Sequence, residues 1–196
     1  MKLTRLTFLA AMLALVVGLQ GCIPLIVGGG AAVGVSAIHD RRTAGAAMED
    51  QNIELKAVRL EYDDPDIKDR TSISATSYNM LVLLTGQAET EELRARYVDK
   101  IKQIPHVKKV VNEIQIGPTS SLAQNSNDSY ITSKVKVKMF DIEIPDFDPT
   151  RVKIITEMGT VYLMGLLTHQ EADAVVEKAR YVKGVTRVVK VFEYVD

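Results

Sequence analysis

The sequence predicts an α+β fold made of two tandem units, each with the order α-β-β-α-β and with its helices packed on one face of a three-stranded sheet. An internal repeat is the first observation: residues 73–93 match residues 152–172 at an offset of 79, and residues 104–111 match residues 182–189 at an offset of 78. The second is that both copies pass from short strand-like segments into an amphipathic helical pattern. Duplication of one small unit explains both observations.

A helix is predicted at the start of each copy, at residues 52–62 and 128–141. In the second copy, four apolar residues at helical spacing share the face expected to contact the core: Ile131, Val135, Met139 and Ile142. In the first copy, an insert-like segment, DDPDIKDR at residues 63–70, separates this helix from the first strand.

Two short strands follow the first helix in each copy. They are predicted at residues 71–76, 80–85, 151–156 and 160–164. The segments between them, residues 77–79 and 157–159, contain Ser, Asn and Gly, which favour hairpin turns.

A longer amphipathic helix then begins in a polar turn, where Thr90 and Thr168 provide capping hydroxyls. Thr168 and Glu171 have the spacing of a capping box. A last strand closes each copy, at residues 107–116 and 185–194.

Gly86 and Gly165 occupy the same place in both copies, where a strand leads into a helix. A strand, a glycine and a helix start could form a phosphate-binding loop, but a single glycine without a following Gly-Lys-Ser/Thr is a weak signal. A fold joint has to be duplicated with the fold, whereas a ligand loop does not. We therefore predict that both are structural glycines, required for positive φ or for close approach of a helix and a strand where the strand ends.

Residues 1–21 have the features of a lipoprotein signal peptide. Lys2 and Arg5 precede an apolar run of 14 residues at positions 6–19, which is shorter than the roughly 20 residues of a membrane-spanning helix. The following Leu-Gln-Gly-Cys resembles the bacterial lipobox, in which the cysteine is acylated, for example with palmitate, and the chain is cut before it. Cys22 is the predicted lipidation site, and as the only cysteine in the chain it leaves no internal disulfide.

The remaining chain divides by composition. Residues 22–48 are predicted to be an acylated tether, because their glycines lack the spacing and the βαβ context of a dinucleotide-binding motif. A segment rich in Ser and Asn marks a linker at residues 118–126. The two domains are then residues 49–117 and 127–196.

Charge and side-chain chemistry argue against several functions. Without Lys2 and Arg5, 22 basic residues stand against 25 acidic ones, a net charge of about −3, which disfavours a nucleic-acid binder. None of the three histidines, His39, His106 and His169, has a partner at metal-ligand spacing. We expect no enzyme, no metal site and no cofactor, with a hydrolase that uses His169 as a distant alternative.

Four aspartates near the insert, Asp63, Asp64, Asp66 and Asp69, could suggest a calcium loop. Their spacing lacks the central glycine and the closing glutamate of an EF-hand. Whether they bind a cation stays open at this point.

The repeated hydrophobic-x-hydrophobic-x-Gly before a helix, followed by a valine-rich strand, resembles the BON domain. Together with the lipobox, two such copies resemble the dual-BON outer-membrane lipoproteins of the DolP type, most specifically at NDSYITSKVKVKM (residues 127–139) and VYLMGLLT (residues 161–168). The resemblance implies an outer-membrane anchor facing the periplasm, binding of anionic phospholipid (phosphatidylglycerol or cardiolipin) through the second domain, and support of outer-membrane integrity, in some members at the division site. It implies no enzymatic activity, and the acidic charge balance leaves no nucleic-acid partner expected.

The first helix of the second copy is the candidate phospholipid-binding face, formed by Tyr130, Lys134, Val137 and Lys138. With Lys136, this helix places three lysines within five residues of an otherwise acidic chain. Aromatic rings and lysine stems suit a lipid headgroup interface. One alternative is a helix whose lysines only keep it soluble; another is a protein-interaction module that docks an envelope-assembly or peptidoglycan-modifying partner.

Overall fold

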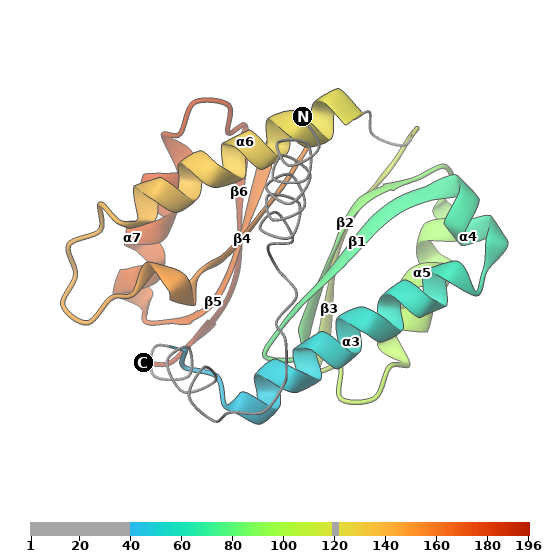
Figure 1. The fold of residues 1–196 in the computed structure, drawn as a ribbon, viewed down its shortest axis with the longest axis horizontal. Coiled ribbons are helices and arrows are strands. Elements are labelled where there is room, and N and C mark those ends of the chain that lie inside the picture. The colour runs from blue at the N-terminus through green and yellow to red at the C-terminus, as the bar shows by residue number, and fades with distance from the viewer. Residues whose placement is uncertain (1–39, 119–121) are drawn as a thin grey trace, which may run out of the picture. The chain divides into compact units, whose positions relative to one another are not determined.

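The computed structural model describes residues 40–118 and 122–196. The predicted signal peptide, Cys22, most of the predicted tether and His39 lie outside the described residues. Within the described ranges the chain forms two three-stranded sheets, each in a unit of its own (Figure 1).

The first unit contains α3 (Ala44–Tyr62), α4 (Pro65–Arg70), β1 (Thr71–Tyr78), β2 (Leu81–Ala88), α5 (Glu91–Lys102) and β3 (Lys109–Ile116). The central strand β2 pairs antiparallel with β1 and parallel with β3. Both α3 and α5 lie on one face of this sheet (Figure 1).

The second unit repeats this plan with α6 (Leu122–Met139), the short 3₁₀ helix η1 (Pro149–Arg151), β4 (Lys153–Glu157), β5 (Thr160–Leu167), α7 (His169–Arg180) and β6 (Arg187–Tyr194). Its strand order is β4-β5-β6, with β5 antiparallel to β4 and parallel to β6. The predicted α+β class, with two α-β-β-α-β units, is confirmed.

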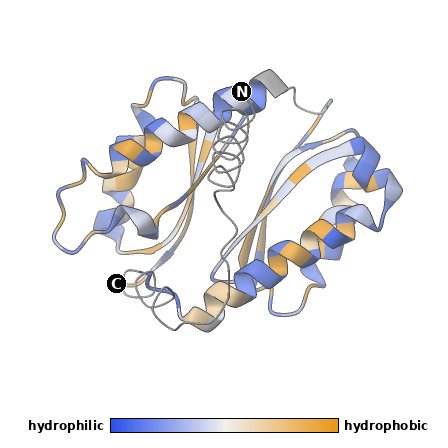
Figure 2. Ribbon diagram, in the orientation of Figure 1, coloured by the Kyte–Doolittle hydropathy of each residue, from blue (hydrophilic) through white to orange (hydrophobic). Residues whose placement is uncertain are grey.

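Each unit has its own apolar core between its helices and its sheet. In the second unit, Ile131, Val135 and Met139 of α6 are buried, and Ile142 is half-buried against them. The predicted core face of this helix is therefore confirmed for Ile131, Val135 and Met139, whereas Ile142 lies beyond the end of α6. Figure 2 shows the alternation of hydrophobic and hydrophilic residues along the helices that this packing requires.

The sheet faces that the helices do not cover contribute to a third apolar cluster. This cluster explains why β2 is buried along its whole length and β5 along nearly all of it. The cluster consists of Tyr78, Leu81, Leu83, Tyr162, Met164 and Val191. At its edges, the Gln87 amide donates to Glu157 at 2.6 Å, and Arg187 donates to Glu113 at 2.8 Å. Strands buried on both faces read as continuous apolar runs, as these two do in the sequence.

Two helices begin earlier than predicted, inside the segments predicted as tether and linker. The helix α3 begins at Ala44 because the Thr43 side chain caps it, accepting a hydrogen bond from the Ala46 amide at 3.1 Å. The helix α6 begins at Leu122, inside the predicted linker. Ser and Asn disfavour a helix only weakly, whereas Pro would break it, and the chain contains no proline between Pro118 and the end of α6.

The first helical turn of α7 confirms the predicted capping box, since Thr168 and Glu171 each accept from the other's backbone amide. The Glu171 carboxylate also accepts hydrogen bonds from both terminal guanidinium nitrogens of Arg41, at 2.6 and 2.9 Å. Burial alone would raise the pKa of Glu171, but the hydrogen bonds from Arg41 and Thr168 outweigh it and hold that pKa below its usual value. The chain just before α3 is thereby joined to the start of α7.

The first hairpin turn overlaps the predicted segment 77–79 only at Asn79, whereas the second lies within the predicted segment 157–159. Asn79 and Met80 form the first turn with φ of 52° and 66°, and Met158 and Gly159 form the second with φ of 49° and 72°. Positive φ at both central residues is the type I′ pattern that matches the twist of the strands. Asn-Met is an unusual pair for such a turn, which is why the first turn is predicted too early in the sequence.

A buried aspartate from the first helix of each unit holds this turn. Asp50 accepts from the backbone amides of Asn79 and Met80 at 2.8 and 2.7 Å. In the second unit, Asp128 accepts from Met158 and Gly159 at 2.8 and 2.9 Å. The two aspartates are 78 residues apart and take the same place in the two units.

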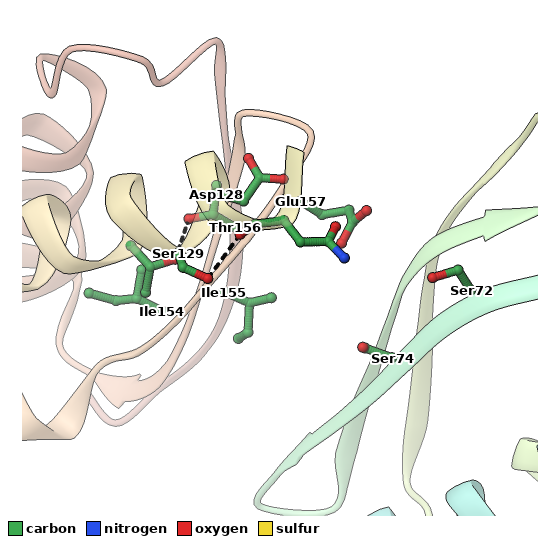
Figure 3. Close-up of a pocket in the computed structure, with 10 residues that line it drawn as sticks. Ser72, Ser74, Asp128, Ser129, Ile154, Ile155, Thr156 and Glu157 are labelled. Atoms are coloured by element: carbon green, nitrogen blue, oxygen red, sulfur yellow. Dashed lines mark hydrogen bonds between the residues drawn. The ribbon is translucent and has the colours of Figure 1, made fainter. Parts of the chain in front are cut away.

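Asp128 lies at a polar cavity of about 420 Å³, together with Ser129 on the same helix and Thr156 and Glu157 on β4 (Figure 3). Both carboxylate oxygens of Asp128 already accept a hydrogen bond from the hairpin amides. The geometry therefore accounts for Asp128 as a link between helix and hairpin.

Gly86 and Gly165 lie inside β2 and β5, not at strand ends as expected. A Cβ on Gly86, whose φ is +110°, would be 1.9 Å from the carbonyl oxygen of Ser72, and a Cβ on Gly165 would be 2.9 Å from that of Arg151. Both close neighbours are backbone atoms: Ser72 lies in β1, and Arg151 is the last residue of η1, just before β4. The structural role of the two glycines stays a prediction, which a substitution can test.

Candidate functional site

The predicted lipid-binding residues lie together on the solvent side of α6. Tyr130 and Val137 are each 64% exposed and point away from the core side chains of the same helix. On a helical wheel, Lys134 and Lys138 flank this ridge on one side and Lys136 flanks it on the other. An exposed apolar ridge between cationic side chains results.

Two of the three lysines are held by local contacts. The Lys134 ammonium is 5.0 Å from the centre of the Tyr130 ring and donates to the carbonyl oxygen of Lys183 at 2.6 Å. Lys138 donates to Asp141 at 2.8 Å, and this hydrogen bond and charge hold the pKa of Asp141 below its usual value. Asp141 therefore offsets part of the positive charge of Lys138.

The turn between α7 and β6 adds a second wall to this face. Tyr181 is 70% exposed, with the Arg180 guanidinium 4.8 Å from its ring centre. Between α6 and the turn is an open groove of about 370 Å³, lined by Ser133, Lys134, Val137, Lys138, Tyr181, Val182 and Lys183. The groove thus combines apolar side chains with three lysines.

Sequence reasoning did not identify Tyr181 or Lys183 as part of the site. At the repeat offset of 78, their positions correspond to Gln103 and Pro105 in the first copy. A comparison of the copies for residues that change from neutral to aromatic or cationic could have found them.

The histidines have structural partners in the described part of the chain. The His169 ring stacks on Tyr194 with centroids 3.9 Å apart, and its Nδ1 lies 2.7 Å from the Asp196 carboxylate. These contacts join the start of α7 to the end of the chain. His106 lies 3.6 Å from Glu49.

The aspartates of the insert contact basic residues of α5. Asp64 is 3.2 Å from the Lys100 ammonium, and Asp66 is 3.4 Å from the Arg96 guanidinium. Within the described ranges, no group of three or more His, Cys, Asp or Glu residues could hold a metal ion. In those same ranges no helix is both long enough and apolar enough to cross a membrane.

Comparisons with known proteins agree with the repeat. The model of the BON domain matches residues 52–118 and 127–196. The outer membrane lipoprotein DolP of Haemophilus influenzae is 38% identical over 197 residues, which is 100% of both chains. The 21 kDa hemolysin of Actinobacillus pleuropneumoniae is 36% identical over 157 residues, 80% of each chain.

Among solved structures, CdsD of the Chlamydia trachomatis type III secretion system is 18% identical, covers 75% of this chain and 65% of its own, and has a TM-score of 0.29. The family assignment rests on the sequence matches. With the BON model matched twice and 38% identity over the full length, the chain belongs to the BON-domain family and is a dual-BON protein of the DolP type.

Proposed function

We propose that the protein is a periplasm-facing outer-membrane lipoprotein, anchored through acylated Cys22, whose second BON domain binds anionic phospholipid such as phosphatidylglycerol or cardiolipin. In this role it supports outer-membrane integrity, including at the division septum, and it needs no catalytic activity. The lipobox and the full-length similarity to an outer membrane lipoprotein support the anchor.

The observation that carries the lipid role is the exposed ridge of Tyr130 and Val137 between lysines. Exposed aromatic and aliphatic side chains are unfavourable in water, and their transfer to the boundary between headgroups and acyl chains is favourable. The groove beside Tyr181 extends this apolar surface beyond one helix.

Electrostatic attraction adds a modest term. Each lysine near an anionic membrane contributes about 1 kcal/mol, and Asp141 offsets part of the contribution of Lys138. Such a surface binds weakly by itself. Acylation at Cys22 would hold the domain close to the lipid and raise its effective concentration.

Charge reversal of two lysines tests this role. We expect the Lys134→Glu, Lys138→Glu double variant to bind phosphatidylglycerol vesicles roughly 30-fold more weakly, or worse, since two attractions of about 1 kcal/mol each are lost. The measurement is vesicle co-sedimentation of the chain from residue 22 carrying Cys22→Ser, so that acylation does not hold it on the membrane.

The matched control is Lys108→Glu with Lys109→Glu, which changes the net charge equally on exposed residues of the first domain. It should leave binding nearly unchanged. The lipid role fails if the parent chain binds phosphatidylcholine vesicles as well as phosphatidylglycerol, or if the two double variants lose binding equally.

Tyr181 provides a separate prediction. We expect Tyr181→Ser to weaken binding to phosphatidylglycerol vesicles roughly fivefold, corresponding to about 1 kcal/mol of lost aromatic burial. Ile116→Ser is the control, because Ile116 is also an exposed apolar residue but lies in the first domain, outside either proposed surface. Equal binding by both variants would remove the turn between α7 and β6 from the lipid surface.

A further inference from the structure

The helix α3 has a second apolar face, opposite the one that packs on its sheet. Asp50, Ile53 and Ala57 are buried on the core side. Successive residues turn by about 100°, which places another apolar stripe roughly 180° away, on the solvent side. Four large residues form this stripe: Met48 (67% exposed), Leu55 (68%), Val58 (50%) and Tyr62 (64%).

The spacing of the stripe is that of a coiled-coil seam. Met48, Leu55 and Tyr62 follow one another at intervals of seven, and Val58 lies three residues after Leu55. These are the a and d positions of a heptad repeat, with Gln51 at the remaining d position. Single exposed apolar residues need no explanation, but a stripe along one helix marks a contact surface.

The BON fold itself does not require this stripe. With the helices aligned on Asp50 and Asp128, which hold the equivalent hairpin turns 78 residues apart, Met48, Leu55 and Val58 correspond to Ser126, Ser133 and Lys136 of α6. The equivalent helix is therefore polar at three of the four positions, and it folds on its sheet in the same way. The apolar stripe belongs to α3 alone.

The charges beside the stripe fit a second helix better than an anionic membrane. Glu54 and Glu61 lie on one flank and Arg59 on the other, whereas α6 has three lysines around its ridge. In a parallel two-stranded coiled coil, a g residue faces the e residue five positions later in the other helix. Glu54 and Arg59 have this spacing, so two parallel copies of α3 would place opposite charges together.

Glu54 is fixed on its flank, because its Oε1 accepts from the Ser77 amide and from the Lys153 ammonium, both at 2.8 Å. Its side chain is still about a third exposed and can face a neighbouring helix. An antiparallel pair centred on Leu55 would instead bring two Glu54 carboxylates together. The parallel arrangement is the one that the charges favour.

We propose that α3 pairs in parallel with α3 of a second copy of this chain, with Met48, Leu55, Val58 and Tyr62 in the seam. The pairing is independent of the lipid-binding role of α6. Cys22 lies 22 positions before Ala44 in both copies, so in a parallel pair both chains run from the predicted anchor into the same end of the seam. Confinement in one membrane raises the local concentration, which lets a short seam suffice.

Site-specific crosslinking of the acylated full chain in its own membrane tests the proposal. Met48→Cys, Leu55→Cys and Tyr62→Cys are introduced singly and treated with a short bifunctional maleimide. We expect covalent dimers at all three positions, at least fivefold above Lys56→Cys, which is exposed on the same helix but lies about 100° from Leu55. The parent chain serves as the blank for any reaction at Cys22.

Each other outcome overturns a stated part of the proposal. Dimers no more abundant than with Lys56→Cys exclude the seam. More linkage between coexpressed Met48→Cys and Tyr62→Cys chains than within either variant excludes the parallel direction, and linkage to a different protein excludes the second copy as partner. Lys134→Glu with Lys138→Glu should leave dimers at Leu55→Cys unchanged, so a failure of the lipid role is distinguishable from a failure of the seam.

Discussion

Replacing Gly86 with alanine is expected to destabilise the first domain severely. The new Cβ would lie 1.9 Å from the Ser72 carbonyl oxygen, and 3.0 and 3.1 Å from the Ser72 carbonyl carbon and the Ile73 Cα. All three atoms are backbone, and Gly86 pairs with Ile73 on one side and Ile114 on the other. The central strand cannot move away without breaking a ladder, and a φ of +110° adds strain for any L side chain.

The expected loss is at least about 4 kcal/mol, a large part of the roughly 5–15 kcal/mol that stabilises a small domain. Gly165→Ala should cost less, about 1–3 kcal/mol, because its Cβ would be 2.9 Å from the Arg151 carbonyl oxygen and its backbone is outside the strained region. The bulkier Gly165→Val should exceed Gly165→Ala, and Gly117→Ala, with no atom within 4 Å, should be neutral.

Urea unfolding combined with amide hydrogen exchange separates these effects. In Gly86→Ala, the amides of β2 and β3 should lose protection before those of β5 and β6. If Gly86→Ala unfolds at the same urea concentration as Gly117→Ala, the close approach of β1 and β2 does not constrain this position. The repeated glycine would then need another explanation, including a ligand.

Local sequence patterns predicted the helices and strands, whereas tertiary contacts determine the residues at which they begin and end. The order of helices and strands and the core face of α6 follow from hydrophobic periodicity, which can be read within one segment without knowing its tertiary contacts. The start of α3 depends on the Thr43 cap, and the position of the first turn depends on Asp50, 29 residues before Asn79. Propensity could not reveal a turn made of Asn and Met, because a helix from elsewhere in the unit holds it.

The candidate site likewise has a part that local spacing predicts and a part that depends on tertiary contacts. Tyr130, Lys134 and Val137 lie within eight residues of one helix, so their spacing showed that they share a surface. Tyr181 and Lys183 are more than 40 residues later and reach that surface only because α7 packs against α6. A groove formed by two segments that are distant in the sequence cannot be predicted from the residue pattern of either segment alone.

Replacing Asp50 with asparagine should cost about 3–5 kcal/mol of stability in the first domain. Asp50 is buried and accepts from the Asn79 and Met80 amides, from the Ser77 hydroxyl at 2.6 Å and from the Arg42 guanidinium at 2.8 Å. Asparagine keeps one acceptor oxygen and turns an NH₂ group toward donors. An unsatisfied buried N–H costs about 1–3 kcal/mol, and breaking a buried ion pair about 3–5 kcal/mol.

The second unit supplies an internal comparison for this prediction. Asp128→Asn should cost less, about 2 kcal/mol, because Asp128 holds the Met158 and Gly159 amides but pairs with no arginine in the described part of the chain. Asp99→Asn, on the exposed side of α5, should stay within about 0.5 kcal/mol of the parent. Equal losses at Asp50 and Asp128, measured by urea unfolding, would mean that the hairpin amides alone set the cost and that Arg42 adds nothing. A loss at Asp50 no larger than at Asp99 would mean that the turn keeps its positive φ angles without the helix.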